Sequence, residues 1–324
     1  MNGDWQPCAS LEALRLRAEV YRRIREFFHH RQVLEVETPM LSEAGNTDPN
    51  IESFHLQFSG TSLAGGKTRW LRTSPEFPMK RLLASGLGDC YELGRVFRNG
   101  EFGRRHNPEF SMLEWYRVGW NHLELIEECI ALVQDVFALK GIELPVRRLS
   151  YAELFLELVG IEPHTAGDAQ LQAAVLAKVD IDPEGLRRDD FLDLLMTHCI
   201  EPQLPRRSLT VVYDFPASQC ALARIRSGAV PVAERFELYL GSVELANGYH
   251  ELTDAAEQSR RFDQDLLMRG QRGACAVPKD LRLITALESM PDCAGVAMGI
   301  DRLMMALLDA EKLAETVAFD FSLA

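Results

Sequence analysis

The chain has 324 residues, 47% of them hydrophobic, and carries a formal net charge of −13 from 35 basic and 48 acidic residues. This length provides for one large core or for a domain with an insertion, and no apolar run is long enough to predict a transmembrane helix. The acidic balance argues against a surface that grips nucleic acid, although a local patch can suffice for tRNA.

The seven cysteines are scattered, and no two have the spacing of metal ligands; they are Cys8, Cys90, Cys129, Cys199, Cys220, Cys275 and Cys293. We therefore expect reduced thiols, a cytoplasmic setting and no zinc site. Residues 1–10 lack the apolar core of a signal peptide, which agrees with that setting.

The first predicted element is a helix over residues 11–28, because apolar side chains recur at helical spacing after Ser10, a favourable N-cap. The arginines between them are expected to form a solvated face. A short strand over residues 33–36 follows. The polar, glycine-rich stretch 60–67 lies between apolar runs and predicts the turn of a hairpin.

A strand and turn over residues 70–76 come next, and then a helix that begins at Met79. Two strands over residues 91–97 and 110–116 are joined by a charged loop, and residues 121–139 read as a helix. The charged loop between the two strands is the first part of the chain that concentrates candidate functional residues.

Residues 147–205 contain acidic, leucine-rich helices and few candidate catalytic groups, which predicts a helical insertion. The remaining predicted elements are a strand, a strand pair and a long helix, over residues 209–215, 235–240 with 243–246, and 251–269. Because the strands come in runs without a regular βαβ repeat, we predict an α+β fold with a largely antiparallel sheet flanked by helices.

Near the C-terminus, residues 295–305 read as a glycine-punctuated strand that runs into an apolar helix, with Arg302 at the junction. The glycines let a ligand lie flat on the backbone. The arginine can fork onto phosphate oxygens. Alone, this pattern more often marks an ordinary strand–helix turn with a surface arginine.

A second cluster occupies the charged loop between the two strands. Arg98 could bind an α-phosphate, His106 could bind the terminal phosphates, and Phe110 could stack on adenine. By itself, such a loop is more often a solvated hairpin connection. Its combination with Arg302 in a separate glycine-rich motif favours a nucleotide site.

Two carboxylates form a third candidate group. Glu237 and Glu244 are seven residues apart around Gly241 and Ser242, so a hairpin would place them on adjacent strands. Carboxylate oxygens are hard ligands that suit Mg²⁺, which bridges phosphates. Two surface carboxylates on an edge hairpin are the more frequent meaning of this pattern in isolation.

Together these stretches resemble the class II aminoacyl-tRNA synthetases. Residues 31–40, 97–110 and 295–305 resemble motifs 1, 2 and 3 of that class in the same order. Their amino-acid sequences are most similar to those of lysyl-tRNA synthetase. The string at residues 244–252 is the most specific local match. The resemblance implies ATP-dependent activation of a carboxylate as an acyl-adenylate, Mg²⁺ as cofactor, and a homodimer built around the first motif.

The resemblance also implies roles for individual residues. Arg98 and Arg302 are the implied catalytic residues, and Glu237 and Glu244 the implied metal ligands. The implied ATP contacts are Arg98, Asn99, Gly100, His106, Asn107, Phe110, Glu244, Leu245, Gly299 and Arg302. The implied contacts with the amino-acid substrate are Ser74, Pro75, Glu76, Glu114, Tyr116, Asn247, Tyr249, Glu251 and Ala297.

Three of the implied substrate contacts, Glu76, Glu114 and Glu251, are carboxylates. A pocket with three carboxylates suits a substrate with an ammonium group at each end, because buried carboxylates are costly without cationic partners. Glu114 and Tyr116 are two apart on a predicted strand, so they should share a face.

Two positions depart from the pattern of lysyl-tRNA synthetase. Gly100 stands where the second motif usually has its first glutamate, and Glu101 follows, so a carboxylate that orients ATP is lost or replaced by Glu101. Ala297 stands where lysyl-tRNA synthetase has glycine, and its methyl group is expected at the floor of the amino-acid pocket.

Lysyl-tRNA synthetase carries an N-terminal anticodon-binding domain, and motif 1 begins here near residue 31, which leaves no room for one. We therefore expect residues 1–324 to form a single catalytic domain without that module. This domain organisation and the sequences of residues 105–110 and 215–219 resemble those of the elongation factor P–(R)-β-lysine ligases. That resemblance implies (R)-β-lysine or lysine as substrate and elongation factor P as acceptor, with tRNA and membranes not expected as partners.

Two other functions stay open from the sequence. One is a free-standing enzyme that acylates tRNA or another small acceptor with α-lysine; the missing anticodon domain, the acidic charge and Ala297 weigh against it. The other is an inactive regulatory protein that binds nucleotide or lysine. The departure at Gly100 favours an inactive protein. The implied catalytic and metal-binding residues are intact, which argues against it.

Overall fold

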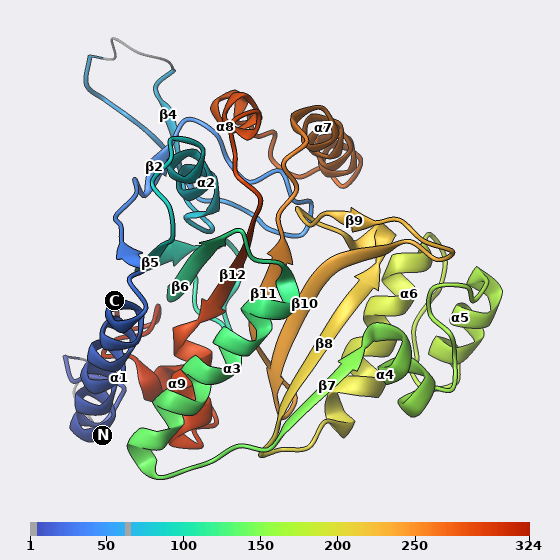
Figure 1. Cartoon of the computed structure of the whole chain (residues 1–324), viewed down its shortest axis with the longest axis horizontal. Helices are drawn as coiled ribbons and strands as arrows, with labels where there is room; N and C mark the ends of the chain where they lie inside the picture. The colour runs from blue at the N-terminus through green and yellow to red at the C-terminus, as the bar shows by residue number, and fades with distance from the viewer. Residues whose placement is uncertain (1–4, 62–65) are drawn as a thin grey trace. The chain divides into compact units, whose positions relative to one another are not determined.

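The computed structural model describes residues 5–61 and 66–324, and the chain divides into two compact units (Figure 1). Residues 1–119 and 252–324 form the first unit, and residues 120–251 form the second. Each unit combines helices with strands whose pairing is mostly antiparallel, as predicted for an α+β protein.

The main sheet of the first unit has the order β1-β5-β6-β12. Its strands are β1 (Leu34–Glu35), β5 (Cys90–Phe97), β6 (Glu109–Val118) and β12 (Cys293–Gly299). β1 pairs with β5 in parallel, whereas β6 pairs antiparallel with both β5 and β12. The strand pair predicted around the charged loop is therefore confirmed.

A smaller antiparallel sheet in the first unit has the order β2-β4-β3. Its strands are β2 (Leu41–Ser42), β4 (Thr68–Leu71) and β3 (His55–Gln57). β3 and β4 pair antiparallel on either side of the predicted turn. Residues 62–65 of that turn lie outside the described residues.

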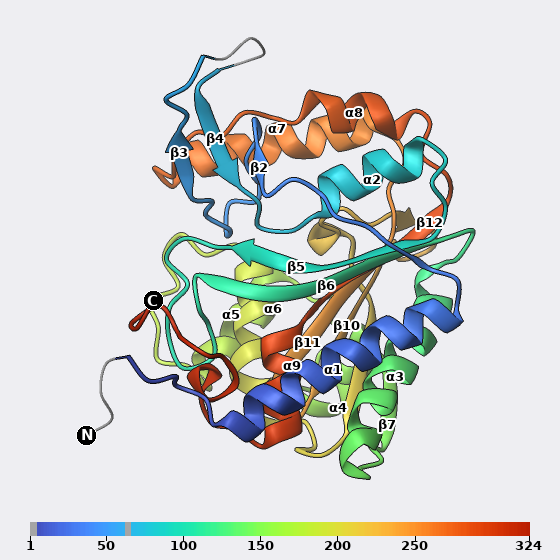
Figure 2. The ribbon, with the colours of Figure 1, turned by 90° about the vertical axis from the view of Figure 1, so that its left-hand side faces the viewer.

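Five helices of the first unit flank its main strands. Helices α2 (Glu76–Ala84), α7 (Ala255–Gln271) and α8 (Leu281–Leu287) lie on one side of β5 and β6, and α1 (Leu11–His30) and α9 (Ile300–Leu308) lie on the other (Figure 2). The Ser10 hydroxyl accepts a hydrogen bond from the Ala13 amide at 3.1 Å, so α1 begins where its cap predicts. The ring of Phe28 stacks on Tyr91 with 4.4 Å between centroids and buries the apolar face of α1.

The prediction that the arginines of α1 form a solvated face is wrong for Arg17. Its side chain is 11% exposed and forms an ion pair with Asp301 of α9 at 2.5 Å. It also donates to the Ser111 hydroxyl of β6 at 2.8 Å. Helical spacing alone cannot reveal this contact, because its partners are distant in sequence.

Two predicted helix starts are also wrong. α2 begins at Glu76, directly after Pro75, rather than at Met79. α7 begins at Ala255 rather than at Glu251, because the Asp254 carboxylate caps the helix by accepting a hydrogen bond from the Glu257 amide at 2.9 Å.

A buried ion pair holds the first motif against β5. Arg72 and Glu92 approach to 2.5 Å, and each side chain is 4% exposed. Glu92 also accepts hydrogen bonds from the amide and hydroxyl of Thr38, at 3.1 and 2.7 Å. Gly94 leaves room for this pair, since a Cβ there would lie 2.5 Å from the Arg72 guanidinium.

The second unit contains strands in the order β11-β10-β8-β7. They are β11 (Val243–His250), β10 (Val232–Leu240), β8 (Leu209–Pro216) and β7 (Val146–Ser150), and the short β9 (Ile225–Arg226) pairs with β10. β7 and β8 run parallel, whereas β8, β10 and β11 are antiparallel. The predicted strand pair on either side of Gly241 is thus confirmed, with longer strands than predicted.

Helix α3 (His122–Phe137) opens the second unit, and α4 (Tyr151–Leu158), α5 (Asp168–Leu176) and α6 (Arg188–Leu195) fall in the stretch predicted as an insertion. Their apolar side chains pack with inward-facing residues of β8 and β10, including Val212, Phe215 and Tyr239. The Tyr151 ring lies 4.8 Å from that of Phe215, which joins α4 to β8. These contacts give the second unit a core of its own.

Among the described residues, no helix has the length and apolarity that crossing a membrane requires. All seven cysteines are free thiols, as predicted.

Candidate active site

The implied adenine and α-phosphate contacts meet at the loop between β5 and β6. The Arg98 guanidinium lies over the Phe110 ring, 5.2 Å from its centroid. Arg98 is 25% exposed and approaches Glu101 at 3.7 Å, so its charge is held near the loop that follows β5. An arginine beside an aromatic face provides one charge for phosphate and one flat surface for a base.

The second implied arginine contacts the same loop. Arg302, in the first turn of α9, places its guanidinium 2.8 Å from Nε2 of His106. Burial, and then the positive charge of Arg302, hold the pKa of His106 below its usual value. The structure therefore brings together Arg98, His106, Phe110 and Arg302, which the sequence places in two separate motifs.

The departure at Gly100 has a conformational reason. Gly100 adopts φ +83°, a left-handed conformation that a glutamate would reach only with strain, and no atom lies within 4 Å of the position of a Cβ. The neighbouring Asn99 is exposed, and its amide donates to the carbonyl of Glu52 at 2.8 Å.

Asn107 serves the structure of the loop. Its side chain is 7% exposed, donates to the Glu109 carbonyl at 2.7 Å and accepts from the Phe321 amide at 3.0 Å. These bonds fix the end of the loop where β6 begins. The contact of Asn107 with ATP that the resemblance implies stays a prediction.

The implied ammonium pocket of the first unit is centred on Glu114. Its side chain is 2% exposed and accepts hydrogen bonds from the Ser74 hydroxyl at 2.6 Å and the Tyr116 hydroxyl at 2.7 Å. Glu114 and Tyr116 thus share one face of β6, as predicted. Two hydrogen bonds from hydroxyl groups hold this carboxylate in one orientation.

Glu76 has a cationic partner within the protein. Lys80, one helical turn later on α2, approaches its carboxylate at 2.5 Å and is itself 1% exposed. The Glu76 amide donates to the Ser74 hydroxyl at 2.9 Å, next to Pro75, which precedes the helix. The sequence analysis missed Lys80 because it placed Glu76 in a turn, whereas in α2 the two residues are four apart on one helix.

The position of Ala297 follows from strand register. Ala297 on β12 lies directly opposite Glu114 on β6. Side chains of directly paired residues project to the same face of an antiparallel sheet. The methyl group of Ala297 is therefore on the face that carries the Glu114 carboxylate, as the predicted pocket floor requires. Gly299 ends β12, and a Cβ there would make only ordinary contacts with Arg302.

The implied metal ligands lie on adjacent strands of the second unit. Glu237 of β10 is paired with Asn247 of β11, and Glu244 of β11 is paired with Tyr239 of β10. Glu237 accepts hydrogen bonds from Arg235 at 2.5 Å and from the Tyr239 hydroxyl. The predicted hairpin arrangement of Glu237 and Glu244 is confirmed, and Arg235 is a neighbour that the sequence analysis did not identify.

The pairing of β10 with β11 contains a bulge next to Glu244. Leu238 pairs with Ala246 and Tyr239 pairs with Glu244, which leaves Leu245 as the extra residue. The Leu245 side chain is 2% exposed and belongs to the core.

The remaining implied substrate contacts follow the same strand. Tyr249 is paired with Arg235, so it shares the face of Glu237 and Asn247. Glu251 is 1% exposed and forms an isolated bridge with Ala223. Glu251 therefore continues the strand instead of opening a helix, which places it beyond Tyr249 with extended geometry.

Comparison with known proteins decides the family. The model of the family of tRNA synthetases class II (D, K and N) matches residues 6–322. The chain belongs to this family. Motifs 1, 2 and 3, inferred from the sequence, all lie within the matched residues.

Three curated relatives of this synthetase-family chain bear one name, elongation factor P–(R)-β-lysine ligase. The protein from Vibrio cholerae is 47% identical over 99% of this chain and 98% of its own length. The protein from Yersinia enterocolitica is 48% identical, covering 98% of this chain and 97% of its own. The protein from Mannheimia succiniciproducens is 46% identical, over 97% of each.

Proposed function

We propose that this class II synthetase-family protein is an ATP-dependent ligase that transfers (R)-β-lysine, or lysine, to a lysine side chain of elongation factor P. The observation that carries the proposal is the 46–48% identity, over nearly the full length of both chains, to three ligases of that name. The buried Glu114, held by Ser74 and Tyr116, provides a fixed anionic group for an ammonium of such a substrate.

The proposed reaction has two steps. The substrate carboxylate attacks the α-phosphate of ATP in line, which forms an acyl-adenylate and releases pyrophosphate. The amine of the acceptor lysine then attacks the acyl carbon, which forms an amide bond and releases AMP. Positioning and charge neutralisation accelerate such steps, so no nucleophilic side chain of the enzyme is needed.

Charged side chains supply the neutralisation. Arg98 is assigned to the α-phosphate and Arg302, with His106 beside it, to the terminal phosphates. A neutral His106 can donate to phosphate oxygens, and the anionic phosphates would raise its pKa. Phe110 offers its ring to the adenine.

Glu237 and Glu244 would hold Mg²⁺. Both offer hard carboxylate oxygens on adjacent strands, and Arg235 and Tyr239 orient Glu237. When bound, the ion would offset negative charge on the phosphates.

The proposed ammonium contacts are Glu114 with Tyr116 in the first unit and Asn247, Tyr249 and Glu251 in the second. Glu76 is assigned to the amino group near the reacting carboxylate. Because Lys80 already binds Glu76 at 2.5 Å, that contact would be shared between the two cations. We further propose that both units belong to one catalytic domain without an anticodon-binding module, with residues 147–205 as a helical insertion.

The proposal is tested by intact-mass measurement of elongation factor P after incubation with the protein, ATP and each lysine isomer. We expect the acceptor to gain the mass of one β-lysyl group, and no gain when ATP is omitted. A parallel reaction with tRNA in place of elongation factor P distinguishes the proposed ligase from an enzyme that acylates tRNA. Acylation of tRNA with an unmodified elongation factor P would overturn the proposed acceptor.

We also propose that the protein acts in the cytoplasm as a homodimer with a two-fold interface around motif 1. Leu34, Met40 and Leu41, which lie in or next to motif 1, are 51%, 41% and 45% exposed and offer apolar surface for such an interface. Light scattering at micromolar concentration should give twice the chain mass, and Leu34→Glu should lower it toward one chain. A wild-type monomer would contradict the proposal.

Ala297→Gly should raise activity with α-lysine relative to β-lysine. The amino group of β-lysine lies one carbon further from the carboxylate, so the isomers must seat their backbones differently beside Glu114. The methyl group of Ala297 lies on the same face and can disfavour one seating. One methyl group typically changes such discrimination by about 1–3 kcal/mol.

The measurement for Ala297→Gly is pyrophosphate exchange with each isomer on both proteins. The wild type should prefer β-lysine. Gly299→Ala is not a suitable control because it touches Arg302, whereas Ala274→Gly changes an alanine in a loop that carries no site residue. An isomer ratio that Ala297→Gly leaves unchanged would assign Ala297 to packing alone.

A further inference from the structure

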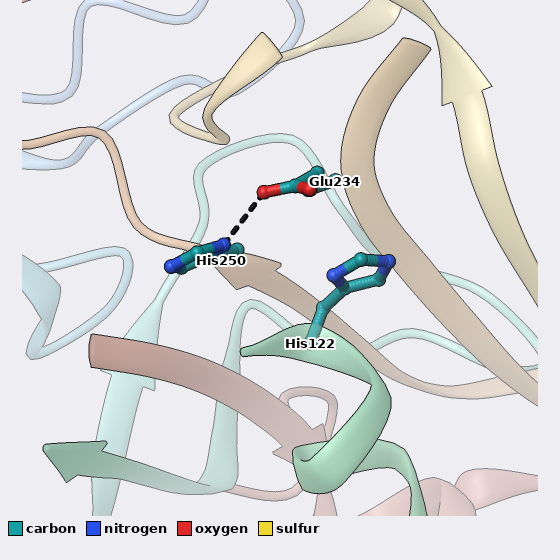
Figure 3. A group of neighbouring side chains, drawn as sticks. All are labelled: His122, Glu234 and His250. Carbon is teal, nitrogen blue, oxygen red and sulfur yellow. Dashed lines mark hydrogen bonds and ion pairs between the residues drawn. The ribbon is translucent and has the colours of Figure 1, made fainter. Parts of the chain in front are cut away.

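A second group of polar side chains lies in the second unit and has no role in the proposed reaction. His122 is the first residue of α3, Glu234 lies on β10, and His250 is the last residue of β11 (Figure 3). Each offers one ligand atom, and these atoms all lie within 4.8 Å of one another. Nδ1 of His250 is 2.6 Å from the Glu234 carboxylate.

The three side chains are removed from solvent. His122 is 1% exposed, Glu234 is 9% exposed and His250 is 8% exposed. Neither ring nitrogen of His122 has a hydrogen-bond partner, although buried polar atoms normally have one. Figure 3 shows one of these nitrogens directed toward the pair formed by Glu234 and His250 and the other directed away.

The carboxylate of Asp214 faces the ring nitrogen of His122 that is directed away from the group. Oδ1 of Asp214 lies 3.4 Å from Nε2 of His122. Histidines that bind metals usually direct their second nitrogen toward a carboxylate or carbonyl, which fixes the tautomer and the ring orientation. With its proton on Nε2 facing Asp214, His122 would present the lone pair of Nδ1 to the group.

The strands are distorted where these groups meet. The pairing of β10 with β8 shifts between Ala233 and Phe236, which is the bulge that contains Glu234. Asp214, on β8 beside the shift, adopts φ +58°. Bulges re-aim side chains, and non-glycine residues with positive φ are uncommon and gather at functional sites. The distortion turns Glu234 and Asp214 away from simple strand alternation.

Arg226 contacts one of the two carboxylate oxygens of Glu234. It contacts one Glu234 oxygen, Oε1, at 3.2 Å and also binds Asp214. The other oxygen, Oε2, is the one that faces His250. Arg226 thus neutralises the carboxylates from outside the group and leaves Oε2 directed inward.

We propose that His122, Glu234 and His250 bind a divalent transition-metal ion such as Zn²⁺, which ties the start of α3 to strands β10 and β11. Two imidazoles and one carboxylate are a frequent three-ligand set for zinc, with a fourth position open to water. Imidazole nitrogen favours such ions over Mg²⁺, so this site is chemically distinct from the one assigned to Glu237 and Glu244. Binding would replace the His250–Glu234 hydrogen bond, and the proton of a neutral His250 would then lie on Nε2, which leaves the lone pair of Nδ1 for the ion.

The test is a titration of the full-length protein with Co²⁺ and with Zn²⁺ after dialysis against a chelator, without ATP. We expect saturable binding of one ion per chain at micromolar concentration. The Co²⁺ complex should show ligand-field absorption without a thiolate charge-transfer band, because the ligands are nitrogen and oxygen. Excess Mg²⁺ should not displace the ion, and bound Zn²⁺ should raise Tm.

Variants identify the ligands. His122→Gln and His250→Gln should each weaken binding by at least about tenfold and remove the rise in Tm. His198→Gln, at an exposed histidine of the same unit, should change neither. A wild-type protein that shows no saturable binding would overturn the proposal, whatever the variants do. Equal binding by both variants and the control would also overturn it, because the ion would then lie elsewhere.

Discussion

Arg302→Ala should reduce lysine-dependent pyrophosphate exchange to below about one hundredth of the wild-type rate, while the protein stays folded. Removal of one group that stabilises charge in a transition state typically costs about a hundredfold to a thousandfold in rate. Arg302 lies in the first turn of α9 and contacts His106 at 2.8 Å. Its partly exposed position means that truncation leaves the core of α9 intact.

The matched control for Arg302 is Arg104→Ala. Arg104 lies in the loop between β5 and β6, is 62% exposed and pairs with Glu311 at the surface. Its loss should leave the exchange rate close to that of the wild type, because exposed ion pairs contribute little to the stability of the fold. Arg302→Lys should recover part of the activity, since lysine keeps the charge but lacks the fork of guanidinium donors. Undiminished exchange in a folded Arg302→Ala protein would remove Arg302 from the site.

Glu251→Gln should raise KM for the lysine substrate at least about tenfold. The change keeps the shape of the side chain and removes one negative charge from a position that is 1% exposed. A charge-assisted hydrogen bond to an ammonium contributes roughly 1.5–3 kcal/mol, which corresponds to tenfold or more in binding. The measurement is pyrophosphate exchange as a function of lysine concentration, with KM and kcat determined separately.

Glu157→Gln is the control for Glu251. Glu157 belongs to α4 of the same unit and forms an ion pair with Arg147, with 45% of its side chain exposed. We expect no change in KM for that variant. If Glu251→Gln also left KM unchanged at an unchanged Tm, Glu251 would not contact the ammonium group.

Local patterns in the sequence predicted the larger part of the fold. The N-cap at Ser10, the strand pair on either side of the charged loop and the hairpin around Gly241 were all correct. Each depends on neighbours within a few residues, such as a cap, alternation along a strand or a glycine in a turn. The ranges of the helices were less accurate, because α7 begins at its aspartate cap and not where the apolar spacing starts.

The candidate site was partly predictable for the same reason. Glu114 and Tyr116 are two residues apart on one strand, so the sequence alone assigned them to one face, and the motif placed Arg302 at the start of a helix. The contact between Arg302 and His106 joins residues 196 apart in sequence and required the fold. The ion pair of Arg17 with Asp301 likewise joins the first helix to the last one.

The sequence by itself determined the family motifs, the α+β class and the residue types of an adenylating site, because these follow from short-range spacing and residue chemistry. Tertiary structure decided which charges are buried and which partners they meet. Arg72 beside Glu92, Arg17 beside Asp301 and the group His122, Glu234 and His250 are the main examples. The ligands of that group come from α3, β10 and β11, and only strand pairing with a bulge brings them within reach of one ion.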